Sequence, residues 1–265
     1  MPHPLLPPPA DRPLYGGWSM LANAAAVGSM ARAGFDWVLL DTQHGEHDDR
    51  SVRECLATSR GAAPVLVRPA TCDPHEITRY LDAGAAGVVV PMVSTVEQAR
   101  AAVRACRYGP AGTRSWGPHA IHCGLRFPTP AEADANVLCA VMVETREGLR
   151  NVEAIAAVEG VDVVFVGPFD LSLSLELDVE DLLAADGPED PLPAVLRACA
   201  EAGVVAGAFG VTAERSARLR DLGFRFIAAA TDCGLVQSGA RERLAGLALP
   251  AQHPAVTADR VLSAR

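Results

Sequence analysis

The chain has 265 residues, of which 49% are apolar and only 5% are aromatic, and its net charge is −9. This length suits one large α/β domain or two small ones, and α/β barrels routinely reach this length as one domain. The negative charge argues against a nucleic-acid surface, and no apolar run reaches the ~18 residues of a membrane span. We therefore expect a protein that binds neither nucleic acid nor membrane.

Two features of residue usage narrow the possible chemistry. All 23 basic residues are arginine, so the chain has no lysine for a Schiff base with substrate or pyridoxal phosphate, or for a P-loop. The seven cysteines are odd in number, form no CxxC pair and lie mostly inside apolar runs. This pattern predicts reduced, buried thiols in a cytoplasmic protein.

The two ends of the chain differ from its middle. Residues 1–13, MPHPLLPPPADRP, are rich in proline and lack the basic start and long apolar middle of a signal peptide. We expect a disordered tail there, a single domain over residues 14–250, and a C-terminal tail over residues 251–265.

Eight short apolar runs recur along this domain, and the early ones show little alternation of polar and apolar residues. Such runs are typical of strands buried on both faces in a parallel sheet. They cover residues 14–20, 37–43, 64–70, 87–93, 139–145, 161–167, 204–210 and 224–231.

Amphipathic segments with helix start and stop signals separate the runs. Residues 73–84, DPHEITRYLDAG, open with an Asp cap and a Pro at the first helical position and close on Gly. Residues 23–34, 94–108 and 212–223 follow similar schemes. Eight strand–helix units predict a (β/α)8 TIM barrel, and no GxGxxG motif follows a strand to favour a dinucleotide fold. The long irregular connection over residues 109–138 is typical of a functional lid.

Polar side chains stand at the carboxyl ends of several predicted strands, which is where the chemistry of such barrels takes place. They are Asp41, Gln43 and His44 after the second strand, Arg68 after the third, Glu144 after the fifth, Asp170 after the sixth, and Thr231 and Asp232 after the eighth.

Several of these residues also have a purely structural interpretation. Asp170 could cap the helix that follows it, and Arg68 could be an ion-pair partner. His44 could be held by packing or by Asp41. The segment DTQHGEH, residues 41–47, looks at first like a metal site, but we interpret His47 within it as a solvated loop residue.

Taken together, the set favours chemistry on an anionic substrate. Glu144 and Asp170 suit a hard divalent cation, which takes one or two carboxylates and completes its shell with water or substrate. The planar fork of Arg68 can bind a substrate carboxylate, and His44 can transfer a proton near neutral pH. A bound cation would polarise a ketone and stabilise an enolate.

The chain resembles the HpcH/HpaI family of metal-dependent class II pyruvate aldolases from about residue 14 to residue 247. The segments that carry this resemblance, in order, are WVLLDTQHGEH, VLVRPA, VVVPMV, YGPAGTR, VMVETREG and VDVVFVGPFDLSLSL. The resemblance implies a (β/α)8 barrel of the phosphoenolpyruvate/pyruvate superfamily type. It also implies an eighth helix exchanged between partners and a homo-oligomer, often a hexamer built as a trimer of dimers.

The same resemblance assigns a metal and substrate site. It implies that Glu144 and Asp170 bind the divalent cation, Mg2+, Mn2+ or Co2+. It implies that Arg68 holds and polarises the pyruvyl group of the substrate. The backbone N–H groups of Phe169 and Asp170 would face the substrate carboxylate.

Further roles follow from the resemblance for residues around this site. His44, oriented with help from Asp41, would assist proton transfer through a water. Asp82 matches a position that reaches a neighbouring subunit's site. Trp18 is a candidate substrate contact, and Trp116 is a candidate wall of the aldehyde pocket, although it could instead pack under the lid.

The chain departs from common family patterns at three positions. Thr42 and Gln43 stand where many relatives have Gly-Glu, which marks a subtype. Met142 stands where some relatives have a glutamine, so a polar contact to the pyruvyl group from that position is lost.

The expected reaction is reversible cleavage of a 4-hydroxy-2-oxo acid to pyruvate and an aldehyde through a metal-stabilised pyruvate enolate. A decarboxylase acting on oxaloacetate, or a related lyase, would use the same enolate. A non-catalytic barrel that binds 2-oxo acids is an alternative from another class. A lyase for a CoA thioester would need a basic patch, and the arginines show no clear cluster for one.

Overall fold

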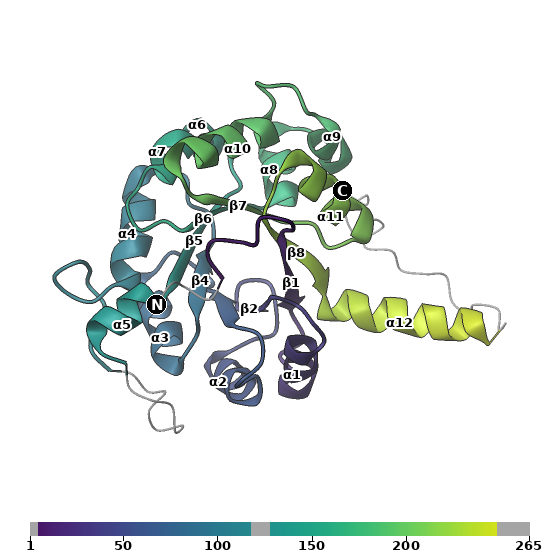
Figure 1. The fold of residues 1–265 in the computed structure, drawn as a ribbon, viewed down its shortest axis with the longest axis horizontal. Coiled ribbons are helices and arrows are strands. Elements are labelled where there is room, and N and C mark those ends of the chain that lie inside the picture. Colours follow the sequence, from purple (N-terminus) through teal and green to yellow (C-terminus); the bar gives the residue numbers. More distant parts are fainter. Residues whose placement is uncertain (1–4, 118–127, 248–265) are drawn as a thin grey trace. The chain divides into compact units, whose positions relative to one another are not determined.

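The computed structural model describes residues 5–117 and 128–247, and the chain divides into two compact units, residues 1–232 and 233–265. In the first unit eight parallel strands close into a barrel in sequence order (Figure 1). The strands are β1 (Leu14–Ser19), β2 (Trp37–Asp41), β3 (Val65–Arg68), β4 (Gly87–Val90), β5 (Leu138–Val143), β6 (Val163–Val166), β7 (Val205–Phe209) and β8 (Phe226–Thr231). All eight predicted strands and the (β/α)8 fold are confirmed.

Helices connect the strands and surround the barrel (Figure 1). They are α1 (Ala24–Arg32), α2 (Asp49–Thr58), α3 (Pro74–Ala83), α4 (Val96–Cys106), α5 (Pro130–Ala135), α6 (Arg146–Arg150), α7 (Val152–Ala156), α8 (Pro168–Leu175), α9 (Val179–Ala184), α10 (Pro191–Ala202) and α11 (Ala213–Leu222). Helix α12 (Asp232–Gly246) begins at the last residue of the first unit, and the described part of the second unit is residues 233–247.

The predicted capping residues begin and end the helices where the sequence indicates. Asn23, Asp73, Thr95 and Thr212 each accept a backbone N–H of the first turn of their helix. Gly84 ends α3 in the left-handed conformation, with φ of 104°, which glycine adopts without the steric cost of a Cβ. These local signals fix where each helix starts against the barrel.

The barrel interior is filled with large side chains from alternate strand positions. Along β2, Trp37 and Leu39 point inward, whereas Val38 and Leu40 pack against the outer helices. The ring of Trp37 stacks on Phe226 with centroids 4.3 Å apart. Because side chains alternate between the two faces of a strand, a strand buried on both faces needs an uninterrupted apolar run.

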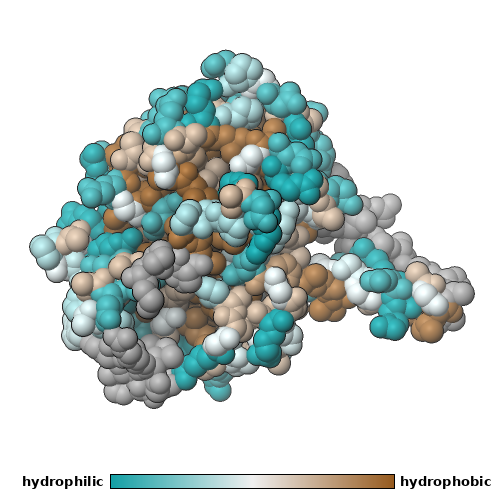
Figure 2. Space-filling model, in the orientation of Figure 1, coloured by the Kyte–Doolittle hydropathy of each residue, from teal (hydrophilic) through white to brown (hydrophobic). Residues whose placement is uncertain are grey.

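The outer layer packs small aliphatic residues between strands and helices. Val, Leu, Ala and Cys dominate this larger cluster, as the shortage of aromatic residues requires. Four cysteines in it, Cys55, Cys106, Cys139 and Cys199, are buried free thiols, which agrees with the prediction. Figure 2 shows hydrophilic residues over much of the outer surface, with apolar residues gathered toward the middle of the face.

The expected disordered N-terminal tail is wrong for residues 5–13. Leu5 is only 3% exposed and belongs to the inner barrel cluster. Arg12 forms an ion pair with Asp36 at 2.7 Å, and Arg225 donates to the Arg12 carbonyl. The apolar pair of leucines inside the proline-rich run therefore serves the fold, which a compositional argument overlooks.

No described helix is long and apolar enough to cross a membrane.

Gly16 offers a test of the barrel packing. An added Cβ at Gly16 would lie 2.2 Å from the buried Trp37 ring, so the Trp37–Phe226 stack would have to shift. We expect Gly16→Ala to cost about 1–3 kcal/mol, with Tm falling about 2–4 °C for each kcal/mol. Gly246→Ala, where nothing lies within 4 Å, is the matched control in thermal unfolding followed by circular dichroism. An unchanged Tm for Gly16→Ala would contradict this packing.

Candidate active site

The predicted polar residues gather at the carboxyl end of the barrel. All strands are parallel, so Trp18, Asp41 and Arg68, which end or nearly end β1, β2 and β3, lie at the same rim. Glu144 directly follows β5, and its ionisation is influenced by the charges of Asp170, Arg68 and Asp41. The structure therefore brings Asp41, Arg68, Glu144 and Asp170 together, as the sequence predicts.

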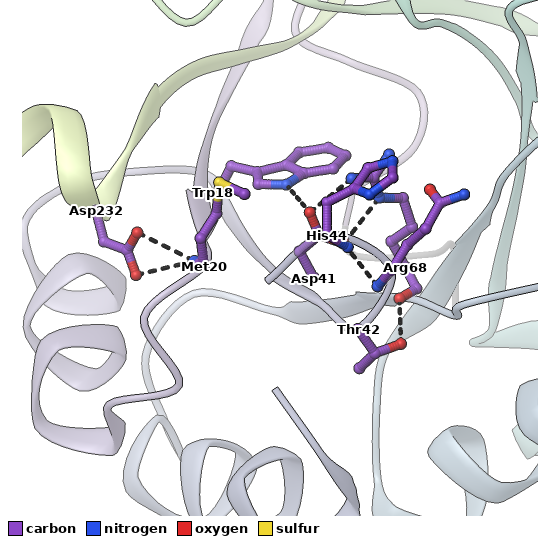
Figure 3. Close-up of polar contacts among 8 residues, drawn as sticks. Trp18, Met20, Asp41, Thr42, His44, Arg68 and Asp232 are labelled. Atoms are coloured by element: carbon purple, nitrogen blue, oxygen red, sulfur yellow. Dashed lines mark hydrogen bonds and ion pairs between the residues drawn. The ribbon is translucent and has the colours of Figure 1, made fainter. Parts of the chain in front are cut away.

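Asp41 is the centre of a buried hydrogen-bond cluster at this rim. Its carboxylate has no exposed surface and accepts from Arg68 through Nε at 3.0 Å and Nη2 at 2.6 Å. The indole Nε1 of Trp18 donates to the same carboxylate at 3.0 Å (Figure 3). Burial acts to raise the pKa of Asp41, but hydrogen bonding and the positive charge of Arg68 outweigh it and lower the pKa. Asp41 is therefore an ionised structural partner of Arg68.

Arg68 is held from several sides. Its guanidinium lies 5.0 Å from the centroid of the Trp18 ring, and only 7% of the residue is exposed. The hydroxyl of Thr42 donates to the backbone carbonyl of Arg68 at 2.7 Å. The structural interpretation of Arg68 as an ion-pair partner is thus correct. Since Asp41 takes only Nε and Nη2, the pairing leaves the Nη1 edge of the fork unused by Asp41.

His44 and Asp41 are linked through the backbone. The N–H groups of His44 and Gln43 donate to Asp41 Oδ1 at 3.2 and 3.0 Å. Among the residues that the structure describes, the His44 imidazole itself makes no hydrogen bond. Figure 3 shows the ring beside the Asp41–Arg68 pair. Asp41 therefore fixes the loop that carries His44, while the imidazole stays available for other partners.

Glu144 is the second buried carboxylate, and its environment is the opposite of that of Asp41. The residue is 2% exposed, and burial together with the nearby negative charge of Asp170 raises its pKa to about 7. The backbone N–H of Met92 donates to Oε1 at 2.7 Å and works against this rise. A Cβ on Gly167 would lie 2.4 Å from Oε2, so Glu144 packs directly against the Gly167 backbone.

The segment that holds the Glu144 carboxylate has an unusual backbone. Met92 adopts a φ of 57°, in the left-handed region that non-glycine residues rarely occupy. This conformation delivers its N–H to Glu144 Oε1. Strained backbone of this kind concentrates at functional sites, where the surrounding structure holds it. Sequence reasoning missed Met92, because the motif PMVS carries no turn glycine to mark a left-handed residue.

Asp170 does not cap its helix. The N-cap of α8 is Gly167, which makes no side-chain cap bond, and Asp170 is the third helical residue with an exposed side chain. The capping interpretation is thus wrong, because the Asp170 carboxylate does not cap α8. The N–H groups of Phe169 and Asp170 lie in the first turn, where backbone donors have no acceptor within the helix. Such a helix start favours an anion.

Glu144 and Asp170 form an oxygen donor pair that suits a hard cation. A buried carboxylate with a raised pKa and no cationic partner in hydrogen-bond contact is chemically matched to a divalent ion, which would displace its proton. No group of three or more His, Cys, Asp or Glu side chains in metal-binding arrangement occurs within residues 5–117 and 128–247. A cation here would take two protein carboxylates and fill its remaining positions with water or substrate, as Mg2+ commonly does.

Asp82 lies apart from this cluster, on the outer helix α3. Its Oδ1 accepts from Arg114 Nη2 at 2.9 Å, and Arg114 stacks over the Tyr108 ring at 4.6 Å. Burial raises the pKa of Asp82, although the Arg114 charge opposes the rise. Trp116 is 50% exposed, and its ring lies 5.3 Å from that of Tyr108. Asp82 and Trp116 are thus connected to each other through Arg114 and Tyr108, and they are not part of the Asp41–Glu144 cluster.

Three further histidines lie in segments described above. His119 and His122 fall within the predicted lid, residues 109–138, but outside the described residues. The interpretation of His47 as a solvated loop residue is wrong. His47 is only 6% exposed, and its Nε2 lies 3.0 Å from Ser19 Oγ. The polar sequence around His47 hid this contact, because its partners come from segments far away in the chain.

Comparison with known proteins gives relatives across almost the whole chain. A hydroxypyruvate/pyruvate aldolase of Deinococcus radiodurans is 40% identical over 87% of this chain and 84% of its own length. A 2-dehydro-3,6-dideoxy-6-sulfogluconate aldolase of Pseudomonas putida is 37% identical, with 88% and 91% covered. A 4-hydroxy-2-oxo-heptane-1,7-dioate aldolase of Klebsiella pneumoniae is 35% identical, with 87% and 88% covered.

Solved structures with the same fold include a family protein from Burkholderia cenocepacia. It superposes with a TM-score of 0.82 and 33% identity, covering 90% of this chain and 96% of the other. The HpcH/HpaI aldolase/citrate lyase family model matches residues 14–238. The chain therefore belongs to the HpcH/HpaI aldolase/citrate lyase family.

Proposed function

We propose that the protein is a metal-dependent aldolase that reversibly cleaves a 4-hydroxy-2-oxo acid into pyruvate and an aldehyde. The observation that carries this proposal is the pair of buried carboxylates at the barrel rim. Asp41 is neutralised by Arg68, whereas Glu144 has a raised pKa beside Asp170. The aldolase names of relatives that are 35–40% identical support the same reaction class.

In this proposal Glu144 and Asp170 hold the divalent cation, which is Mg2+, Mn2+ or Co2+. When bound, the cation supplies Lewis-acid stabilisation to the 2-oxo acid and to the enolate formed from it. The chain has no lysine, so a Schiff base cannot serve as the electron sink. This absence and the Glu144–Asp170 pair point independently to the same class of aldolase.

The remaining rim residues bind and orient the substrate. Arg68 presents its guanidinium to the pyruvyl group and stabilises negative charge on the oxygen at C2. The N–H groups of Phe169 and Asp170 receive the substrate carboxylate at the start of α8. Trp18 sets the position of Arg68 through the Asp41 carboxylate and the ring contact.

His44 moves the proton. In the cleavage direction it accepts the proton of the C4 hydroxyl through a water, and the C3–C4 bond then breaks to release the aldehyde. The electron pair of that bond becomes the pyruvate enolate, and a proton delivered to C3 gives pyruvate. Asp41 contributes by fixing the backbone of His44 in place. An imidazole with no internal partner among the described residues suits this role.

We further propose that the protein works in the cytoplasm as a homo-oligomer, a hexamer arranged as a trimer of dimers. Within residues 1–232 every strand before β8 is followed by at least one helix. A groove of about 450 Å³ opens between α1 and α11, lined by Tyr15, Phe35, Ala217 and Ala229 among others. A second copy of the chain is suited to cover this groove, and in the assembly Asp82 would reach a neighbouring site.

Deuterium exchange into the methyl group of pyruvate tests the proposed function. We expect exchange, followed by proton NMR, only after Mg2+ or Mn2+ is added to metal-stripped protein. Glu144→Ala should lower the rate at least about 100-fold, because it removes a group needed for enolate formation. Glu147→Ala, at an exposed carboxylate three residues away, is the matched control.

Absence of exchange with every metal, while pyruvate still binds, would contradict the aldolase proposal. Release of CO2 from oxaloacetate without any aldol cleavage would instead identify a decarboxylase. Binding without turnover of either kind would identify a non-catalytic 2-oxo-acid-binding barrel.

The raised pKa of Glu144 predicts how metal affinity depends on pH. When the pH is below the Glu144 pKa of about 7, a proton occupies the carboxylate and competes with the cation. Mn2+ affinity should therefore be highest above about pH 8 and fall up to about tenfold for each pH unit below 6.5. Electron paramagnetic resonance of free Mn2+ measures this affinity from pH 5.5 to 8.5. A flat profile would show that Glu144 is not a ligand.

A further inference from the structure

Three polar residues that the proposed mechanism does not use form a buried network next to the rim. Ser19 ends β1, His47 precedes α2, and Asp232 follows β8, so they come from three distant parts of the sequence. Their exposed fractions are 0%, 6% and 3%. Polar groups this deeply buried keep hydrogen-bond partners, and here they partner one another.

The hydrogen bonds of the network define where its protons lie. Ser19 Oγ donates its one proton to Asp232 Oδ2 at 2.8 Å. The same oxygen lies 3.0 Å from His47 Nε2 and can therefore only accept there. His47 must carry its proton on Nε2. Burial lowers the pKa of His47 despite the negative charges of Asp232, Asp41 and Asp48, which agrees with a neutral imidazole.

The arrangement is not that of a nucleophilic triad. The carboxylate contacts the serine hydroxyl, whereas a triad requires a carboxylate on the second nitrogen of the imidazole. Ser19 also has no exposed surface with which to reach a substrate. The network must act through the backbone that it holds.

That backbone is the segment following β1. Asp232 accepts the N–H of Met20 at 3.0 Å (Figure 3). It also accepts the N–H of Leu21 at 3.0 Å. The Met20 carbonyl in turn accepts the N–H of Glu46 at 2.8 Å. Gly45 packs against Met20 so closely that a Cβ would lie 3.0 Å from the Met20 Cα. The loop after β2, residues 42–47, thus packs against the segment that follows β1.

His44 lies between the two attachments of this loop. On one side Asp41 accepts the N–H of His44, and Asp41 is itself bonded to Trp18 of β1. On the other side His47 is bonded to Ser19, the next residue of β1. Both ends of the His44 segment are therefore fixed to neighbouring residues of one strand, while the His44 ring remains free to act.

We propose that Ser19, His47 and Asp232 are positioning residues that set the location of the His44 imidazole. This inference rests on the proposed function, in which His44 transfers the proton. Loss of the network would let residues 43–47 move relative to β1, and the imidazole would lose its alignment with the substrate. Metal binding at Glu144 and Asp170 would not change, because those residues follow other strands.

A double-mutant cycle tests whether His47 acts through His44. We expect His47→Leu to lower kcat for cleavage of 4-hydroxy-2-oxo-heptane-1,7-dioate by about ten- to a hundredfold, in line with the loss of a buried hydrogen bond. His47→Gln, which keeps a donor near the Nε2 position, should restore most of the rate. In a His44→Ala background, His47→Leu should have almost no further effect. The Mn2+ affinity of each variant should equal that of the unaltered chain.

Amide hydrogen exchange measured by mass spectrometry provides a readout that does not depend on activity. Peptides covering residues 43–47 should exchange faster in Ser19→Ala and His47→Leu, because the loop is then no longer held in place beside the acceptors of its N–H groups, Asp41 and the Met20 carbonyl. Ser29→Ala and His75→Leu, at exposed sites outside the Ser19–His47–Asp232 network, serve as matched controls.

Two results would overturn the proposal. The first is unchanged exchange of residues 43–47 in both network variants. The second is an equal loss of kcat on His47→Leu with and without His44. Failure of the proposed function is distinguishable, because the unaltered chain would then show no metal-dependent exchange of pyruvate protons, while amide exchange would still report on the network.

Discussion

The site depends on the different hydrogen-bond partners that the barrel gives to two buried carboxylates, Asp41 and Glu144. A buried charge is costly unless it is paired. Asp41 receives a fork of two bonds from Arg68 and one from Trp18, so it stays ionised with a lowered pKa. Within the part of the chain that the structure describes, Glu144 accepts one hydrogen bond, from the Met92 N–H, and its pKa rises to about 7. The fold satisfies the first carboxylate internally, whereas in the proposed function a bound cation satisfies the second.

This division of roles explains why so many elements meet at one rim. Asp41 joins β1, β2 and β3 through Trp18 and Arg68. It also accepts the backbone N–H of His44 and so fixes the loop that carries the proposed proton-transfer residue. Glu144 is held between Met92, which has a left-handed backbone, and Gly167, the N-cap of α8. Substrate groups would then enter a frame that is already organised, which is the condition for electrostatic stabilisation of an enolate.

Much of this could be predicted from the sequence because the signals are local. The apolar runs predicted all eight strands. Asp73 and Gly84 indicated the two ends of α3. The rim residues were identifiable because strand ends of a parallel barrel share one face. Contacts between distant segments left no such signal. The burial of His47 depends on Ser19, and the order of residues 5–13 depends on Leu5 entering the inner core. The pairing of Asp41 with Arg68 rather than with the His44 ring likewise joins two strands that are distant in the sequence.

A crystal structure with Mn2+ and oxalate, a flat dianion that mimics the pyruvate enolate, tests the central claim most directly. The account predicts an anomalous Mn2+ peak coordinated by Glu144 and Asp170. It also predicts an oxalate carboxylate facing the N–H groups of Phe169 and Asp170, with Arg68 at the other oxygens. A peak that engages neither Glu144 nor Asp170 would contradict the account, because the unpaired carboxylate would then have another purpose.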